Sequence, residues 1–71
     1  MDVNKLSRMA NQIAANFAAQ GEEKAVAETA LHIWKFWDPR MKAAIYADDL
    51  GDLSPIAKAA ILKLKAEAAA A

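Results

Sequence analysis

Apolar side chains recur at intervals of three and four residues along most of the chain, and short breaks separate the stretches that do so. The interruptions fall at Gly21, Pro39, Gly51 and Pro55. This spacing places apolar side chains on one face of an α-helix. The sequence therefore predicts an all-α fold, a small compact bundle of four short helices at 3–19, 22–37, 39–50 and 55–67.

The ends of these predicted helices carry residues suited to capping. Asp2 precedes the first helix as an N-cap residue, and Gly21 follows it at the position where helices favour glycine. Proline fits the first helical position and disfavours helical geometry in the residue before it. Two later boundaries use that combination, with an N-cap residue ahead of the proline: Asp38-Pro39 and Ser54-Pro55.

The first two predicted helices each have an apolar stripe that should face the core. In the second helix the stripe is broad, because Ala27, Leu31 and Trp34 widen the line through Val26, Ala30, Ile33 and Trp37. A small core that is short of leucine favours placing both tryptophans inside. We therefore expect the core to be built on Leu6, Ile13, Phe17, Val26, Ile33, Trp34 and Trp37.

Other large side chains lie away from these stripes. His32 and Phe36 are four residues apart on a flank of the second helix that the core does not need. The third helix has apolar residues on two sides, which is typical of a helix wedged between elements or exposed to a partner. Aromatic residues and arginine are enriched at the centres of protein interfaces. We consider four residues as candidates for contact with another chain: His32, Phe36, Arg40 and Tyr46.

Composition limits how stable such a bundle can be alone. The 71 residues suffice for a single helical domain, and nineteen of them are alanine, which buries little surface. Cysteine is absent, which excludes disulfides, thiolate-bound iron–sulfur clusters and the common structural zinc sites. We expect low stability in isolation, or dependence on another chain. The terminal alanines have almost nothing to bury and are expected to fray.

Charge gives no sign of a nucleic-acid or membrane partner. The chain has nine basic and nine acidic residues and a pI near 6.5. No run of 18 apolar residues occurs, and the polar amphipathic start does not resemble a secretory signal. We expect a cytoplasmic protein.

Side chains that could form a catalytic centre are scarce. His32 is the single histidine, and the hydroxyls other than Tyr46 are Ser7, Thr29 and Ser54. Neighbouring carboxylates at 22–23 and 48–49 project about 100° apart on a helix and cannot share a proton as a catalytic dyad does. There is no glycine-rich phosphate loop and no metal-ligand spacing. The sequence predicts no catalytic, cofactor-binding or metal-binding residues.

Three blocks of sequence, in this order and spacing, resemble the small delta subunit of cytoplasmic NAD-dependent formate dehydrogenases. They are KLSRMANQIAANF (5–17), HIWKFWDPRMKAAI (32–45) and LSPIAKAAI (53–61). The resemblance implies an accessory subunit that binds the large catalytic subunit and supports its assembly or stability. It also implies that the molybdenum or tungsten cofactor, the iron–sulfur clusters and FMN belong to partner subunits.

The first block adds two exposed positions, Arg8 and Gln12, to the interface candidates. A different hypothesis is a self-associating module or regulator, in which the apolar flanks pair with a second copy of the same chain. Sequence alone leaves both hypotheses open. They differ in whether a homodimer persists when the catalytic subunit is present.

Overall fold

A computed structural model describes residues 2–70, and within them it contains helices and no strand. Four α-helices follow one another, with a 3₁₀ turn between the first two. This confirms the predicted all-α class. The elements are α1 (Val3–Phe17), η1 (Ala18–Gln20), α2 (Glu22–Phe36), α3 (Pro39–Tyr46) and α4 (Pro55–Ala70).

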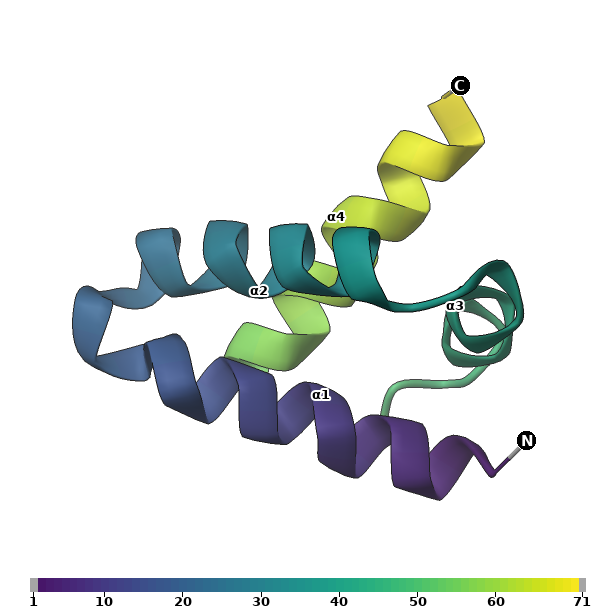
Figure 1. Cartoon of the computed structure of the whole chain (residues 1–71), viewed down its shortest axis with the longest axis horizontal. Coiled ribbons are helices and arrows are strands. Elements are labelled where there is room, and N and C mark those ends of the chain that lie inside the picture. Colours follow the sequence, from purple (N-terminus) through teal and green to yellow (C-terminus); the bar gives the residue numbers. More distant parts are fainter. Residues whose placement is uncertain (1, 71) are drawn as a thin grey trace.

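The helices form a compact body of about 29 × 27 × 21 Å. Helices α1 and α2 run antiparallel along opposite long edges, joined by η1, and α4 packs across both of them (Figure 1). Helix α3 lies at the end of the body where α2 finishes, and the last turns of α4 extend away from it (Figure 1). Helix α4 therefore diverges from α2 toward the C-terminal end of the chain.

The two predicted aspartate caps are confirmed. Asp2 accepts a hydrogen bond from the Asn4 backbone at 3.0 Å, and Asp38 accepts one from the Met41 backbone at 2.9 Å. Pro39 occupies the first turn of α3, where its missing N–H costs no helical hydrogen bond. Each cap satisfies one of the backbone donors that a helix start leaves unpaired.

Ser54 also follows the prediction, whereas α1 ends at Phe17 instead of residue 19, so Gly21 follows the 3₁₀ turn η1 and not α1 itself. The Ser54 hydroxyl accepts a hydrogen bond from the Ala57 backbone at 3.3 Å and caps α4. Gly21 adopts a φ of 96° between η1 and α2, in a region that a side chain disfavours. This conformation lets the chain reverse direction between two antiparallel helices.

Helix α3 is shorter than predicted, because it ends at Tyr46 instead of near residue 50. The carboxylates of Asp48 and Asp49 accept hydrogen bonds from the backbone N–H groups two residues further on, at 3.1 and 2.9 Å. Such local bonds compete with helical ones. Leu50 then takes a φ of 63° and is almost fully buried. The strain of that conformation, on the order of 1 kcal/mol, is offset by burial of the leucine side chain.

Helix α4 is longer than predicted, because it continues through Ala70 instead of stopping near residue 67. Alanine has the highest helix propensity, so the run extends the helix without any packing. All residues from 65 to 70 are exposed. Fraying of these alanines stays a prediction, and Ala71 lies outside the described residues.

The core is built mainly from small and β-branched residues. Of the seven predicted core residues, Leu6, Ile33 and Trp37 are buried, Ile13 and Val26 are partly buried against the core, and Phe17 is half-buried. Alanines fill much of the remaining space and let the helix backbones approach closely. The core cluster consists of Leu6, Ala10, Ala14, Ala30, Ile33, Trp37, Ile45, Leu50, Ala57, Ala60, Ile61 and Leu64.

A single side chain fastens the loop before α4 to α1. The Asn11 amide donates a hydrogen bond to the Asp52 carbonyl at 2.9 Å and accepts one from the Ser54 backbone at 2.8 Å. Asn11 therefore satisfies two backbone groups of a segment more than forty residues away in sequence. This fixes where α4 begins relative to α1.

Candidate functional site

The aromatic side chains near the end of α2 separate into one buried and two exposed residues. Trp37 is 5% exposed, whereas Trp34 is 59% and Phe36 71% exposed. An exposed indole and an exposed phenyl ring on one short helix are unusual for a small soluble domain, which mostly exposes polar side chains. These two rings are therefore candidates for contact with another molecule.

The expected core position of Trp34 is wrong, and the reason is the rotation of α2 about its own axis. Ala25, Thr29 and Ile33 are each 0% exposed, so the buried arc of α2 is centred on them. At about 100° per residue, Trp34 lies about 100° away from Ile33, at the edge of that arc. Small residues at 25 and 29 allow this face to pack closely, which turns Trp34 outward.

Lys42 of α3 holds Trp34 at that edge. Its ammonium group donates a hydrogen bond to the Trp34 carbonyl at 2.9 Å and lies 4.1 Å from the centroid of the indole ring. The first contact satisfies a carbonyl near the C-terminal end of α2, where a positive charge is also favoured by the helix dipole. The second is a cation–π interaction. Lys42 thus orders an exposed aromatic side chain.

His32 and Phe36 form a second exposed feature, on the opposite flank of α2. Their ring centroids are 4.7 Å apart with a tilt of 44°. His32 is half-buried and supports the more exposed phenyl ring. Arg40 is exposed just beyond the Asp38-Pro39 boundary, four residues after Phe36.

The other predicted interface residues lie elsewhere. Arg8 and Gln12 are exposed on α1, and α1 and α2 occupy opposite edges of the body (Figure 1). Gln12 donates a weak hydrogen bond, at 3.4 Å, to Asn16 on the same helix. No hydrogen bond, ion pair or aromatic contact within residues 2–70 joins Arg8 or Gln12 to the other candidates. The six residues therefore do not form one cluster.

Tyr46, a predicted interface residue, is partly buried in the fold. It packs against the core, and its Oη atom is buried with no hydrogen-bond partner in the described part of the chain. Burial raises the pKa of the Tyr46 phenol above its ordinary value of 10.0, and the nearby Glu67 carboxylate raises it further. The hydroxyl of Thr29 is likewise buried without a partner there.

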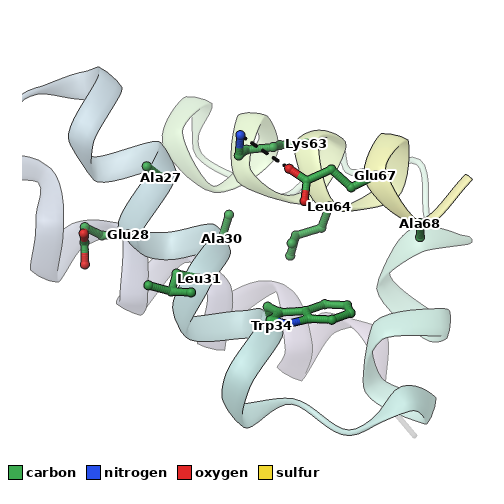
Figure 2. Close-up of a pocket in the computed structure, with 9 residues that line it drawn as sticks. All are labelled: Ala27, Glu28, Ala30, Leu31, Trp34, Lys63, Leu64, Glu67 and Ala68. Atoms are coloured by element: carbon green, nitrogen blue, oxygen red, sulfur yellow. Dashed lines mark ion pairs between the residues drawn. The ribbon is translucent and has the colours of Figure 1, made fainter. Parts of the chain in front are cut away.

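An apolar groove of about 610 Å³ lies between α2 and the C-terminal half of α4. Leu64 projects from α4 toward α2 and the Trp34 indole lies across one end (Figure 2), while Leu31 lines the groove from α2. The polar groups belong to Glu28 and to the Lys63–Glu67 ion pair, whose atoms are 3.4 Å apart. The groove is lined by Ala27, Glu28, Ala30, Leu31, Trp34, Lys63, Leu64, Glu67 and Ala68.

Sequence reasoning missed this groove because its two walls are about thirty positions apart in the chain. One signal was present. The stripe on α2 was too broad for a single packing partner, since Ala27, Leu31 and Trp34 widened it. Only the path of α4 shows that these residues line a groove instead of the core.

The described residues offer little for chemistry. No group of three or more histidine, aspartate and glutamate side chains within residues 2–70 is placed to hold a metal ion. None of the helices in that part of the chain is long and apolar enough to cross a membrane. What the exposed surfaces provide is ordered aromatic and apolar area, which suits binding to another protein.

Comparison with known families identifies residues 5–61, most of the chain, as matching the NADH-dependent formate dehydrogenase delta subunit, FdsD. The match spans all three sequence blocks that carry the resemblance noted above. Comparison with curated proteins and with solved structures gives no match. The matched region runs from α1 into α4 and includes most of the fold. The chain therefore belongs to the delta subunit family of NADH-dependent formate dehydrogenases.

Proposed function

We propose that the chain is a non-catalytic accessory subunit of a cytoplasmic NAD-dependent formate dehydrogenase complex, in which it binds and stabilises the large catalytic subunit. The observation that carries this proposal is the family match over residues 5–61. The molybdenum or tungsten cofactor, the iron–sulfur clusters and FMN would then be held by the partner subunits. A chain without cysteine supplies no thiolate for a cluster, which agrees with that assignment.

Exposed aromatic side chains support a binding role. Phe36 is the most exposed of the large hydrophobic side chains described, and its ring is ordered by His32. Arg40 is exposed four residues later, just beyond the Asp38-Pro39 boundary, and can donate several hydrogen bonds to a partner. An ordered ring loses little conformational entropy on binding, so it contributes more of its contact energy to affinity.

The proposal is tested by expressing the tagged chain together with the other subunits of the complex and purifying it through the tag. We expect the large catalytic subunit to be retained in a fixed stoichiometry. We also expect the unfolding temperature of that subunit to fall when the chain is omitted. A chain that elutes alone as a stable monomer contradicts the proposal.

Variants test the surface involved. Phe36→Ala and Arg40→Ala should each weaken retention of the catalytic subunit by about tenfold, with unchanged helical circular dichroism. Leu62→Ala is the matched control, because Leu62 is also a large exposed apolar residue, 46% exposed, on the different helix α4. If the Leu62 variant weakens retention as much as the Phe36 variant, the effect is not specific to the end of α2.

Self-association is the competing hypothesis. Sedimentation velocity at increasing protein concentration, with and without excess catalytic subunit, separates the two. We expect any homodimer to dissociate into a mixed complex. A homodimer that persists in the presence of excess catalytic subunit would favour a self-associating module and overturn the proposal.

A further inference from the structure

The side of α2 that faces α4 carries a line of side chains that changes from acidic to small to aromatic along the helix. Glu23, Ala27, Ala30 and Trp34 follow at spacings of four, three and four residues, so they lie on one side of the helix. An acidic residue stands at one end of the line and an aromatic ring at the other, with two small residues between them. The small residues leave the depth that the groove occupies.

The groove continues along this line beyond its apolar part. A neighbouring hollow of about 450 Å³ shares Ala27 and Lys63 with it and is lined further by Glu22, Glu23 and Val26. From Glu23 to Trp34 the helix rises about 17 Å, since each residue adds about 1.5 Å. That length equals about three turns of a second helix laid alongside.

The wall formed by α2 carries three carboxylates that form no ion pair with another described residue. Lys63 and Glu67 neutralise one another, and this is the only pair of oppositely charged side-chain groups within 4.0 Å in the part of the chain that the structure describes. The carboxylates of Glu22, Glu23 and Glu28 therefore have no cation in contact there. An occupant with positive charge toward the N-terminal end of α2 would be favoured electrostatically.

The groove alone offers too little area to hold a homodimer of this chain together. Leu31 and Trp34, which are 44% and 59% exposed, are the large exposed apolar side chains of the groove. Together they offer exposed area on the order of 200 Å². A stable interface buries about 800 Å² on each partner. The groove by itself is too small for a dimer, but its size suits one helix that forms part of a larger interface.

A small molecule is also a poor fit. Ligand pockets place a few polar groups inside the cavity to orient the ligand. Here the polar side chains lining the groove are Glu28, Lys63 and Glu67. Lys63 and Glu67 form an ion pair with each other on α4. Glu28 points away from the groove centre (Figure 2). The interior is formed by alanine, leucine and tryptophan.

We propose that the α2–α4 groove binds an amphipathic helix of the partner subunit, with apolar side chains packed between Trp34 and Leu64 and lysine or arginine side chains beside Glu23 and Glu28. This rests on the proposed function, because it assigns the surface through which the accessory subunit holds its partner. Apolar residues at i, i+3 or i+4 and i+7 of such a helix match the groove length. Its basic residues compensate the three carboxylates of α2.

A groove-filling substitution is the direct test. Ala27 is exposed, so Ala27→Phe places a ring in the groove without entering the core. In the co-expressed complex this variant should retain the catalytic subunit about tenfold less than the wild type, because the ring occupies the site of the incoming helix. Ala19→Phe is the matched control, since Ala19 is exposed outside the groove, and it should retain the subunit normally.

The outcomes separate the two proposals. If the wild-type chain retains no other subunit, the proposed function fails, and the groove proposal fails with it. If the wild type and Ala27→Phe retain the subunit equally, only the groove proposal is overturned. Circular dichroism of Ala27→Phe, expected to match the wild type, excludes unfolding as the cause of a loss.

Charge and cross-linking identify the occupant. Glu23→Lys and Glu28→Lys should each lower retention several-fold, more at low salt than at high salt, whereas Asp52→Lys in the α3–α4 loop should not. A benzoylphenylalanine photo-cross-linker at position 27 should label a partner segment with apolar residues at helical spacing and adjacent lysine or arginine. Labelling of a second copy of this chain, or of a segment without that pattern, overturns the proposal.

Discussion

Asn11 and Ser54 are 43 residues apart in the chain, and the Ser54 backbone N–H donates a hydrogen bond of 2.8 Å to the Asn11 side-chain oxygen. The nitrogen of the same amide donates to the Asp52 carbonyl at 2.9 Å. One short side chain on α1 therefore holds the start of α4. The position of α4 sets the width of its groove with α2. This contact therefore helps to determine the geometry of the candidate binding surface.

Asn11→Ala should destabilise the fold by about 1–3 kcal/mol, because it leaves the partly buried Ser54 N–H without an acceptor. Urea unfolding followed by circular dichroism measures the difference. Gln12→Ala is the adjacent control, since Gln12 makes only a weak exposed hydrogen bond on its own helix. Equal unfolding midpoints for the two variants would show that the loop does not depend on Asn11.

The two tryptophans should differ in their contribution to stability. Trp37→Ala removes a nearly buried ring and should cost about 3–5 kcal/mol, enough to unfold a marginal domain. Trp34→Ala removes an exposed ring and should cost about 1 kcal/mol, mainly through its contact with Lys42. Thermal unfolding measures both effects.

Fluorescence provides a second readout that does not require unfolding. In Trp34→Ala the remaining Trp37 should emit at short wavelength, as buried indoles do, and in the milder Trp37→Phe variant the remaining Trp34 should emit at long wavelength. Similar emission from both variants, together with similar losses of stability in the two alanine variants, would place both rings in the same environment and contradict the structure.

Lys42 and Trp34 should be energetically coupled. A double-mutant cycle with Lys42→Met and Trp34→Leu should give a coupling free energy of about 0.5–1 kcal/mol, because the ammonium group contacts the indole face. Lys35→Met on the exposed surface of α2 should show no coupling to Trp34. A zero value for the Lys42 cycle would mean that the lysine acts through the Trp34 carbonyl alone.

Tyr46 should make the stability depend on pH in the alkaline range. Because burial and Glu67 raise its pKa in the folded chain, the unfolded chain loses the phenol proton first as pH rises. The stabilisation is fully present below the unfolded pKa of about 10 and is lost as pH rises through the higher folded pKa. Tyr46→Phe should remove the part of the loss of stability at alkaline pH that comes from ionisation of this phenol.

The same substitution should also affect the stability measured at neutral pH. Tyr46→Phe removes a buried hydroxyl that has no partner among the described residues, so stability at pH 7 should be unchanged or slightly higher. Unfolding midpoints at pH 7 and at alkaline pH measure both effects. A clear loss at pH 7 would show that the hydroxyl makes a stabilising hydrogen bond in solution.

Helix boundaries that depend on local bonds could be predicted from the sequence. The caps at Asp2, Asp38 and Ser54 join atoms within three residues of one another. The end of α3 was the exception, because Asp48 and Asp49 can either continue a helix or bond the backbone two residues ahead. Burial of Leu50, a tertiary effect, favours the second arrangement.

The candidate site was predictable only in part. Phe36 was expected to be exposed and is, but periodicity alone does not explain it, because His32 and Phe36 lie seven residues after the fully buried Ala25 and Thr29 and so share their side of α2. Trp34 lies at the edge of a broad stripe, where a small rotation decides between core and surface. The groove required residues of α4, which no pattern within α2 indicates.

The sequence by itself determined the number of helices, most of their ends and the family, because caps, breakers and apolar spacing act over a few residues. Only the tertiary structure decided which face of α2 is buried and how α4 crosses it. Small residues at 25 and 29 allow close packing on one side, and Asn11 anchors the start of α4. These long-range contacts turn Trp34 outward and open the groove beside it.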